Sequence, residues 1–329
     1  MKKVRIKFVG FWEGWKSEDN FIINTLKKVC NPILSDEPEI LFSSTFSDEY
    51  MDYDCVRVFY TGENICPDFN EFDYAIGFDD ISFGDRYIRY PLYLVDELYG
   101  DDYHRMLNKH IDIDAKIANK SDFCSFVVSN CVEAEDIRTQ FFNKLSEYKK
   151  VNSGGRYLNN IGKPEGVEDK LEFQMKHKFS ITFENSSHPG YITEKLVQGF
   201  AACTVPIYFG DKNVVAYFNK DSFININDYN DLDEVVEAVK KVDADDELYR
   251  KMLGTPALVN KMHKNQYDEK LTDFLRNIVE QDISDAVRVC RHGFNFNYIK
   301  KHKAMIDAYN KSAWRLHKVA DKIYKMCEK

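Results

Sequence analysis

The fold of this chain is indicated by the stretch Phe179-Ser-Ile-Thr-Phe-Glu-Asn-Ser-Ser-His-Pro-Gly-Tyr-Ile-Thr-Glu-Lys-Leu196. Apolar residues alternate at Phe179, Ile181 and Phe183, which is the period of a buried strand. The segment 185–190 is rich in turn-forming residues, and a helix is expected to begin near Thr193. The stretch therefore predicts a strand–loop–helix junction of an α/β fold.

The start of the expected helix is suited to binding an anion. Unpaired backbone N–H groups and the positive end of the helix dipole lie at a helix N-terminus, where both favour a phosphate. Lys195 adds a full positive charge there, and Tyr191 adds a flat aromatic face. We therefore expect a phosphate-containing ligand at this end of the sheet.

This segment closely resembles the donor-binding signature of the family 10 fucosyltransferases, the α1,3/α1,4-fucosyltransferases that use GDP-fucose, and it is most similar to their bacterial branch. The family pattern continues into a Val-Pro-[Ile/Val]-Tyr-aromatic-Gly strand end, which is Val-Pro-Ile-Tyr-Phe-Gly at 205–210 here. The recognisable resemblance runs roughly over residues 56–253. It implies that Asn185, Tyr191, Glu194 and Lys195 bind the donor, with Glu194 contacting a donor hydroxyl.

A second element, the apolar run 126–128 followed by Ser129, Asn130 and Arg138, resembles the family's strand–Ser-Asn–Arg element. The family's arginine contacts the diphosphate, so the resemblance implies that Arg138 and Ser129 also bind the donor. Taken alone, Arg138 equally fits a solvated helix arginine paired with Glu135. Glu194 likewise fits a charge that merely complements the helix terminus.

The candidate general base is Glu63, in the run Val58-Phe-Tyr-Thr-Gly-Glu-Asn64. An apolar strand delivers this carboxylate at its carboxyl end, where open α/β sheets bind ligands. Partial shielding by Tyr60 and Phe72 would suit a general base. The run from residue 58 to residue 92 resembles the acceptor-side region of bacterial family members, and its glutamate is the family's proposed base. The alternative from the residues alone is a carboxylate that caps its own loop.

The acceptor-binding candidates are Trp12, Glu13 and Trp15, which follow the first expected strand. The family has an aromatic and acidic pair facing the acceptor at this position, and aromatic rings stack on sugar faces. Two neighbouring tryptophans are also common in ordinary cores, so core packing is the competing interpretation.

Apolar strand-like runs alternate with amphipathic helical segments along the chain, which predicts parallel sheets covered on both faces. The resemblance implies the GT-B arrangement, an α/β architecture of two Rossmann-like domains facing across a cleft. We expect an acceptor-binding domain at 1–120, a GDP-fucose-binding domain at 121–285, and a basic amphipathic helical tail at 286–329.

Composition narrows the class of protein. The formal net charge is −9, which argues against nucleic acid as the main partner. The 8 cysteines form no Cys-x-x-Cys pair, so we expect buried, reduced thiols of a cytoplasmic protein. No uninterrupted apolar run is long enough to span a membrane.

The predicted reaction is inverting transfer of L-fucose from GDP-β-L-fucose to the GlcNAc or glucose 3-OH of a β-galactoside-containing glycan such as lactose or N-acetyllactosamine, giving a Lewis x type product. No cofactor is expected. The Asp-x-Asp triplets do not follow clear strands, so Lys195, Arg138 and the helix terminus are expected to serve in place of a metal. The alternatives are another nucleotide-sugar donor, an α1,4 link, or a glycan-binding module with a decayed site.

The segment after residue 287 differs in charge from the rest of the chain, with eleven basic and three acidic residues. Apolar positions recur at spacings of three and four, which predicts one apolar helix stripe flanked by lysines. Two roles are left open by this pattern. The helix packs on its own domains or on a second copy, or it docks on an anionic inner-membrane surface. The apolar positions are Ile306, Tyr309, Ala313, Leu316, Ala320, Ile323 and Cys327.

Overall fold

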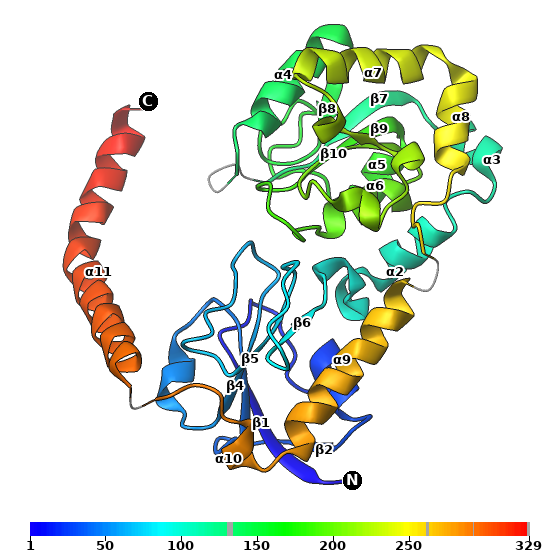
Figure 1. Cartoon of the computed structure of the whole chain (residues 1–329). Helices are drawn as coiled ribbons and strands as arrows, with labels where there is room; N and C mark the ends of the chain where they lie inside the picture. The colour runs from blue at the N-terminus through cyan, green and yellow to red at the C-terminus, as the bar shows by residue number, and fades with distance from the viewer. Residues whose placement is uncertain (130–133, 261–262, 292, 328–329) are drawn as a thin grey trace.

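The computed structural model describes residues 1–129, 134–260, 263–291 and 293–327. Two lobes, each built on a parallel sheet, face one another, and one long helix stands beside them (Figure 1). This is the α/β architecture that the alternating pattern predicts. Asn130 lies outside the described residues, as do the last two residues of the tail.

The first lobe contains a parallel sheet of six strands in the order β2-β1-β3-β4-β5-β6. Their apolar residues pack with α1 and, from far along the chain, α9 in one hydrophobic core. The strands are β1 Lys3–Val9, β2 Asn31–Leu34, β3 Ile40–Ser43, β4 Val56–Tyr60, β5 Tyr74–Gly77 and β6 Tyr87–Arg89, and the helices are α1 Phe21–Leu26, α9 His263–Glu280 and α10 Ile283–Ala286.

The second lobe contains a parallel sheet of five strands in the order β11-β10-β9-β7-β8. The strands are β7 Asp122–Phe126, β8 Val151–Ser153, β9 His177–Phe183, β10 Val205–Phe209 and β11 Ile224–Asn225. The helices are α3 Ile113–Ala118, α4 Ile137–Tyr148, α5 Lys170–Met175, α6 Glu194–Ala201, α7 Leu232–Ala244 and α8 Asp246–Gly254.

The two lobes are joined by helix packing as well as by chain. Helix α2 (Asp96–Leu107) follows the first sheet and packs against α6 of the second lobe. Helix α9 returns to the first sheet, where Leu271, Leu275 and Ile278 are almost completely buried. The predicted range 121–285 therefore includes a helix that packs on the first lobe, because its apolar face matches that core.

The segment after α9 is anchored to the first lobe by Asp73. This fully buried carboxylate accepts the backbone N–H groups of Arg288 and Val289 and pairs with Arg291 at 2.7 Å. Helix α11 (Phe294–Cys327) then extends along one side of the molecule (Figure 1). It confirms that the tail is helical.

Candidate active site

The strand–loop–helix stretch forms as predicted, with α6 beginning directly after Thr193. Glu184 directly follows β9 and is fully buried. Its two carboxylate oxygens accept the backbone N–H and the hydroxyl of Thr193, each at 2.7 Å. Since helix N-termini leave backbone donors unpaired, this buried carboxylate fixes the start of α6.

Lys195 lies in the first turn of α6 between two carboxylates. Its Nζ is 3.2 Å from Glu184 Oε2 and 3.5 Å from Glu194 Oε1. Burial acts to lower the pKa of Lys195, but the charges of Glu184 and Glu194 outweigh it and raise the pKa. Burial acts to raise the pKa of Glu194, and here Lys195 and Lys170 outweigh it and lower the pKa. Both side chains are therefore charged at neutral pH.

Arg138 is buried in α4 and points at residues 185–190 rather than into solvent. This loop is called the donor loop below, because the family resemblance implies that it binds the donor. Its Nη2 donates to the Phe183 carbonyl and to Asn185 Oδ1, both at 2.7 Å, while its Nε has no partner among the described residues. The interpretation of Arg138 as a solvated arginine paired with Glu135 is therefore wrong. Arg138 instead holds Asn185 at the carboxyl end of β9.

Tyr191 and Gly190 lie where the lobes touch. The Tyr191 ring is buried against Phe78, with ring centroids 4.9 Å apart. Gly190 has φ +85°, and a Cβ added there would lie 2.3 Å from the Phe78 carbonyl oxygen. Arg89 Nη2 also donates to the Gly190 carbonyl at 3.1 Å. This loop is therefore clamped against the first lobe.

Glu63 follows β4 on the first lobe and faces the donor loop of the second. Its backbone N–H donates to Thr61 Oγ1 at 3.0 Å. The next residue, Asn64, donates its side-chain N–H to Ser186 Oγ on the other lobe. Glu63 and Asn185 both line a cavity of about 570 Å³, together with Thr45, Phe46, Asn64, Ile65 and Ser186. The structure thus brings the expected base and donor loop together.

The expected shielding of Glu63 is not observed. The Glu63 side chain is exposed, whereas Tyr60 and Phe72 are buried in two hydrophobic cores of the first lobe. The alternation of β4 explains the difference for Tyr60, because that ring points into the sheet's packed face and away from the loop. The carboxylate is therefore open to an acceptor.

The predicted acceptor residues lie in the loop after β1. Trp12 and Trp15 are partly exposed, with ring centroids 4.9 Å apart, and Trp15 stacks on Phe11 at 4.0 Å. Glu13 is exposed. The two tryptophans line a separate cavity of about 370 Å³ that reaches α2. They therefore pack on the core and also face a cavity, which both sequence interpretations allow.

Two further residues near the cleft were missed by the sequence analysis. Burial raises the pKa of Tyr99 on α2, and the charges of Glu194 and Glu63 add to the rise. Lys170 at the start of α5 is near enough to Glu194 to lower its pKa. Both residues come from helices whose sequence contains no recognisable motif. Ser129, by contrast, was singled out by the sequence as a donor-binding candidate, and it is exposed three residues after the end of β7.

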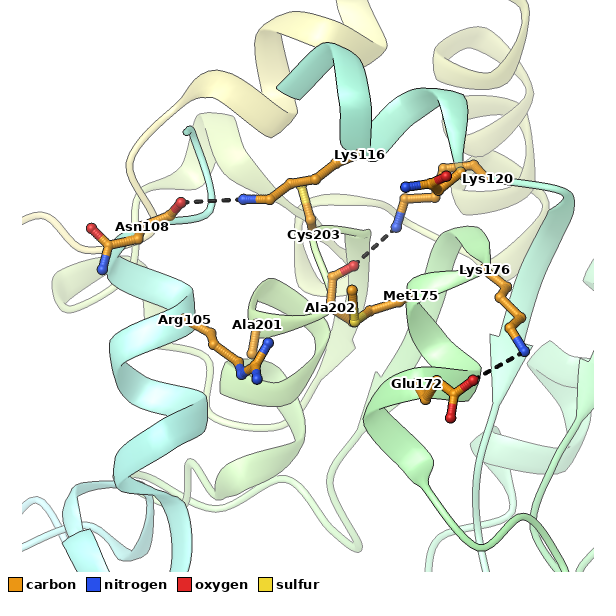
Figure 2. A pocket seen from close by; sticks show the side chains of 11 residues that line it. Arg105, Asn108, Lys116, Lys120, Glu172, Met175, Lys176, Ala201, Ala202 and Cys203 are labelled. Carbon is orange, nitrogen blue, oxygen red and sulfur yellow. Dashed lines mark hydrogen bonds and ion pairs between the residues drawn. The ribbon is translucent and has the colours of Figure 1, made fainter. Parts of the chain in front are cut away.

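A third cavity, of about 430 Å³, lies at the opposite, amino-terminal end of the second sheet (Figure 2). Lys120 donates to the Ala202 carbonyl at 2.9 Å and Lys116 to the Asn108 carbonyl at 3.3 Å, as Figure 2 shows. These lysines donate hydrogen bonds to backbone carbonyls at the carboxyl ends of α2 and α6. Neither Glu63 nor the residues around Lys195 line this cavity.

Most of the described cysteines are buried, and none is in a disulfide. Cys30, Cys55, Cys124 and Cys203 are buried free thiols, as expected, but Cys66 and Cys290 are exposed. The expectation of burial is wrong for these two because they lie in surface loops. Among the described residues, every helix is too short or too polar to cross a bilayer.

Family models match most of the chain. The model described as "Alpha-(1,3)-fucosyltransferase FucT N-terminal domain" matches residues 6–96, and that of "Glycosyltransferase family 10 (fucosyltransferase) C-term" matches residues 117–280. The matched segments contain Glu63 in the first and Arg138, Asn185, Glu194 and Lys195 in the second.

Curated relatives agree with this match. The chain is 36% identical over 258 residues to the alpha-(1,3)-fucosyltransferase FucT of Helicobacter pylori, covering 69% of this chain and 53% of that protein. It is 35% identical over 138 residues to the human 4-galactosyl-N-acetylglucosaminide 3-alpha-L-fucosyltransferase 9, covering 41% of this chain and 37% of that one. The chain thus spans about half the length of the first relative and less of the second.

Solved structures share the fold. A crystal structure of an alpha1,3-fucosyltransferase superposes with a TM-score of 0.74 at 28% identity, covering 85% of this chain and 91% of that one. A crystal structure of an alpha1,3-fucosyltransferase with GDP-fucose superposes with a TM-score of 0.71 at 28% identity, covering 86% and 92%. The two-lobed arrangement, the residues around the cleft and these matches lead to one conclusion: the chain belongs to glycosyltransferase family 10, the fucosyltransferases.

Proposed function

We propose that the chain transfers L-fucose from GDP-β-L-fucose, with inversion, to the 3-OH of GlcNAc or glucose in a β-galactoside-containing glycan. The observation that carries this proposal is the shared cavity of Glu63 and Asn185, which joins the base candidate of one lobe to the donor loop of the other. Family membership and the titles of the similar proteins supply the donor and the linkage.

The donor is proposed to bind on the second lobe. The diphosphate lies by Arg138, Lys195 and the N-terminus of α6, and Glu194 accepts a hydrogen bond from a donor hydroxyl. Asn185, Tyr191 and Ser129 position the nucleotide sugar at the carboxyl end of the sheet. Lys195 is only 22% exposed on its side chain, so its charge is poorly screened by water.

The acceptor is proposed to bind on the first lobe, over Glu63, with Trp12, Glu13 and Trp15 at the far side. Glu63 takes the proton of the acceptor hydroxyl while the oxygen of that hydroxyl forms a bond to the anomeric carbon of fucose. The bond from that carbon to the β-phosphate oxygen breaks on the opposite face, and GDP leaves. Positive groups around the diphosphate stabilise the charge that develops there, so no metal is required.

The test is incubation with GDP-fucose and N-acetyllactosamine, followed by mass spectrometry and linkage analysis. The proposal predicts a product heavier by one deoxyhexose, with an α1,3 link. Transfer from a different nucleotide sugar in a donor panel, or an α1,4 product, would replace this assignment. Tight binding of a fucosylated glycan without turnover would show a binding module instead.

We also propose that α11 contacts a partner outside the two lobes. Ile306, Tyr309 and Leu316 of its apolar stripe are exposed, whereas Ala313 is buried and Lys303 pairs with Glu71 at 2.9 Å. Two partners suit an exposed apolar stripe with basic flanks: an anionic inner-membrane surface and the same helix of a second chain. The side chains of Ala320, Ile323 and Cys327 lie outside the described residues.

A chain truncated after Gly293 keeps the contacts of Arg288, Val289 and Arg291 with the buried Asp73, and it distinguishes the two partners. Salt-sensitive co-sedimentation with anionic vesicles that is lost on truncation supports the membrane. A halved molecular mass in solution on truncation supports the dimer. Unchanged behaviour in both measurements would remove α11 from either role.

A further inference from the structure

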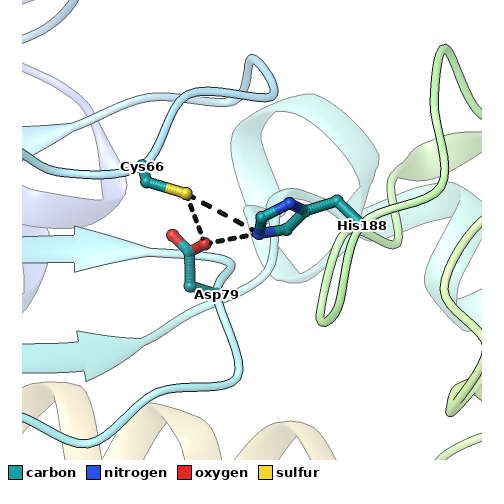
Figure 3. A group of neighbouring side chains, drawn as sticks. All are labelled: Cys66, Asp79 and His188. Carbon is teal, nitrogen blue, oxygen red and sulfur yellow. Dashed lines mark hydrogen bonds and ion pairs between the residues drawn. The ribbon is translucent and has the colours of Figure 1, made fainter.

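Three potential metal ligands meet where the lobes touch, and neither the proposed reaction nor its residues use them (Figure 3). Cys66 follows β4, Asp79 follows β5, and His188 belongs to the donor loop of the second lobe. Asp79 Oδ1 lies 2.8 Å from Cys66 Sγ and 2.8 Å from His188 Nε2, and the sulfur and nitrogen are 3.6 Å apart. These distances place three different ligand atoms around one point.

Asp79 has more binding capacity than its neighbours use. Its side chain is only 3% exposed, and its Oδ2 is buried with no partner among the described residues. A buried carboxylate oxygen without a hydrogen bond is costly, by about 1–3 kcal/mol or more for a charged group. A cation held between these side chains would remove that cost, since a carboxylate can offer either oxygen or both.

The three ligand atoms, a sulfur, a nitrogen and an oxygen, indicate which metal ion the cluster would bind. A thiolate, an imidazole nitrogen and a carboxylate oxygen together suit Zn²⁺, whereas Ca²⁺ and Mg²⁺ prefer oxygen ligands only. In a tetrahedral zinc site, bond lengths of about 2.3 Å to sulfur and 2.0–2.1 Å to nitrogen put these two ligands about 3.5 Å apart. The observed 3.6 Å agrees with this. The sulfur must move about 0.7 Å and the nitrogen about 0.5–0.6 Å further from the Asp79 oxygen, which the exposed Cys66 and the partly exposed His188 permit.

The surrounding contacts hold Asp79 and His188 in place. Tyr87 Oη donates to the Asp79 carbonyl at 2.8 Å, and the His188 ring packs edge-on against Phe78 at 5.6 Å. Gly190 fits so closely on 78–80 that no side chain could be added there. The cluster is therefore part of a packed contact between lobes, with one open side at His188, whose side chain is 34% exposed.

We propose that Cys66, Asp79 and His188 form a zinc site with a fourth position open to water, and that zinc bound there ties the two lobes together beside the cleft. Cys66 is three residues after Glu63, and His188 is three residues after Asn185. The metal would thus link the loop of the base to the loop of the donor. Binding replaces the thiol proton of Cys66, which passes to the buffer, so affinity rises with pH.

The test uses the full chain stripped with EDTA and then titrated with ZnCl₂ against a chromophoric chelator. The proposal predicts one strong site, weakened at least tenfold in Cys66→Ser and in His188→Ala. Cys290→Ser, which removes another exposed free thiol, is the matched control and should bind as wild type. Stoichiometric Co²⁺ should give a thiolate-to-cobalt charge-transfer band in the wild type and in Cys290→Ser, but not in Cys66→Ser.

Thermal unfolding tests the link between lobes. Zinc should raise the unfolding temperature of the wild type and of Cys290→Ser, but not of the two site variants. Equal zinc affinity in all four proteins, or no binding at about 100 μM Zn²⁺, would overturn the proposal. Fucose transfer in EDTA is measured in parallel, so failure of the zinc site and failure of the proposed reaction are told apart.

Discussion

At the scale of single residues, the donor site is a set of compensated charges rather than a cluster of one sign. Lys195 is shared by Glu184 and Glu194, and Arg138 is fixed to Asn185. Because these cations are already held in place, little reorganisation is needed for them to bind a diphosphate. In the proposed reaction they stabilise charge that develops only as GDP departs, so their effect is expected on turnover as well as on binding.

Lys195→Ala and Arg138→Ala should each weaken GDP-fucose binding and lower kcat/KM by about 10²-fold, because each removes a cation from the leaving group. Calorimetry with GDP and initial rates measure the two effects. Lys178→Ala is the control, since Lys178 is also a partly exposed, paired lysine of the second lobe. Wild-type GDP affinity in both site variants would show that the diphosphate binds elsewhere.

At the scale of elements, α6 depends on a carboxylate supplied by the preceding strand. Glu184→Ala should destabilise the protein by about 3–5 kcal/mol, because Lys195 loses its closest buried partner and Thr193 loses its acceptor. Urea unfolding measures this loss. Glu135→Ala removes a carboxylate that accepts the Ser187 N–H from an exposed position, and it should cost under about 1 kcal/mol. Similar losses in the two variants would contradict a capping role for Glu184.

The loop between β9 and α6 is the element that seals the lobes. The control is Gly162→Ala, in the loop between β8 and α5, which adds a side chain at φ +74° with open space around it. It should lower the free energy of unfolding by about 1 kcal/mol. Gly190→Ala has the same backbone penalty and also meets the Phe78 carbonyl, so it should cost about 1–3 kcal/mol more. Thermal melts compare the pair. An equal loss of stability in the two variants would mean that the loop can move away from the first lobe without destabilising the protein.

The sequence was sufficient to predict the elements with strong periodicity or a motif. The β9–α6 junction and the position of Glu63 in the loop after β4 are where the pattern placed them, although the expected shielding of Glu63 is absent. The short strands β2 and β3 and the long-range return of α9 to the first lobe were not predicted, because local periodicity does not show which apolar face meets which. For the same reason, no spacing could show that Cys66, Asp79 and His188 meet.

At the scale of the whole molecule, the proposed reaction divides catalysis between two lobes and uses cations in place of a metal on the leaving group. Treatment with EDTA should therefore leave most of the fucose transfer activity, as initial rates with and without the chelator would show. Abolition by EDTA and restoration by Mn²⁺ or Mg²⁺ would instead assign the diphosphate to a metal.

The central claim is that the base on one lobe acts on a donor held by the other, and Glu63→Gln tests it most directly. The measurement is the rate of fucose transfer from saturating GDP-fucose to N-acetyllactosamine, with GDP affinity determined on the same protein. The account predicts a rate lower by about 10²- to 10⁴-fold with nearly unchanged GDP affinity, because Glu63 contacts the acceptor and not the diphosphate. A rate within tenfold of wild type, or a tenfold loss of GDP affinity, would contradict it.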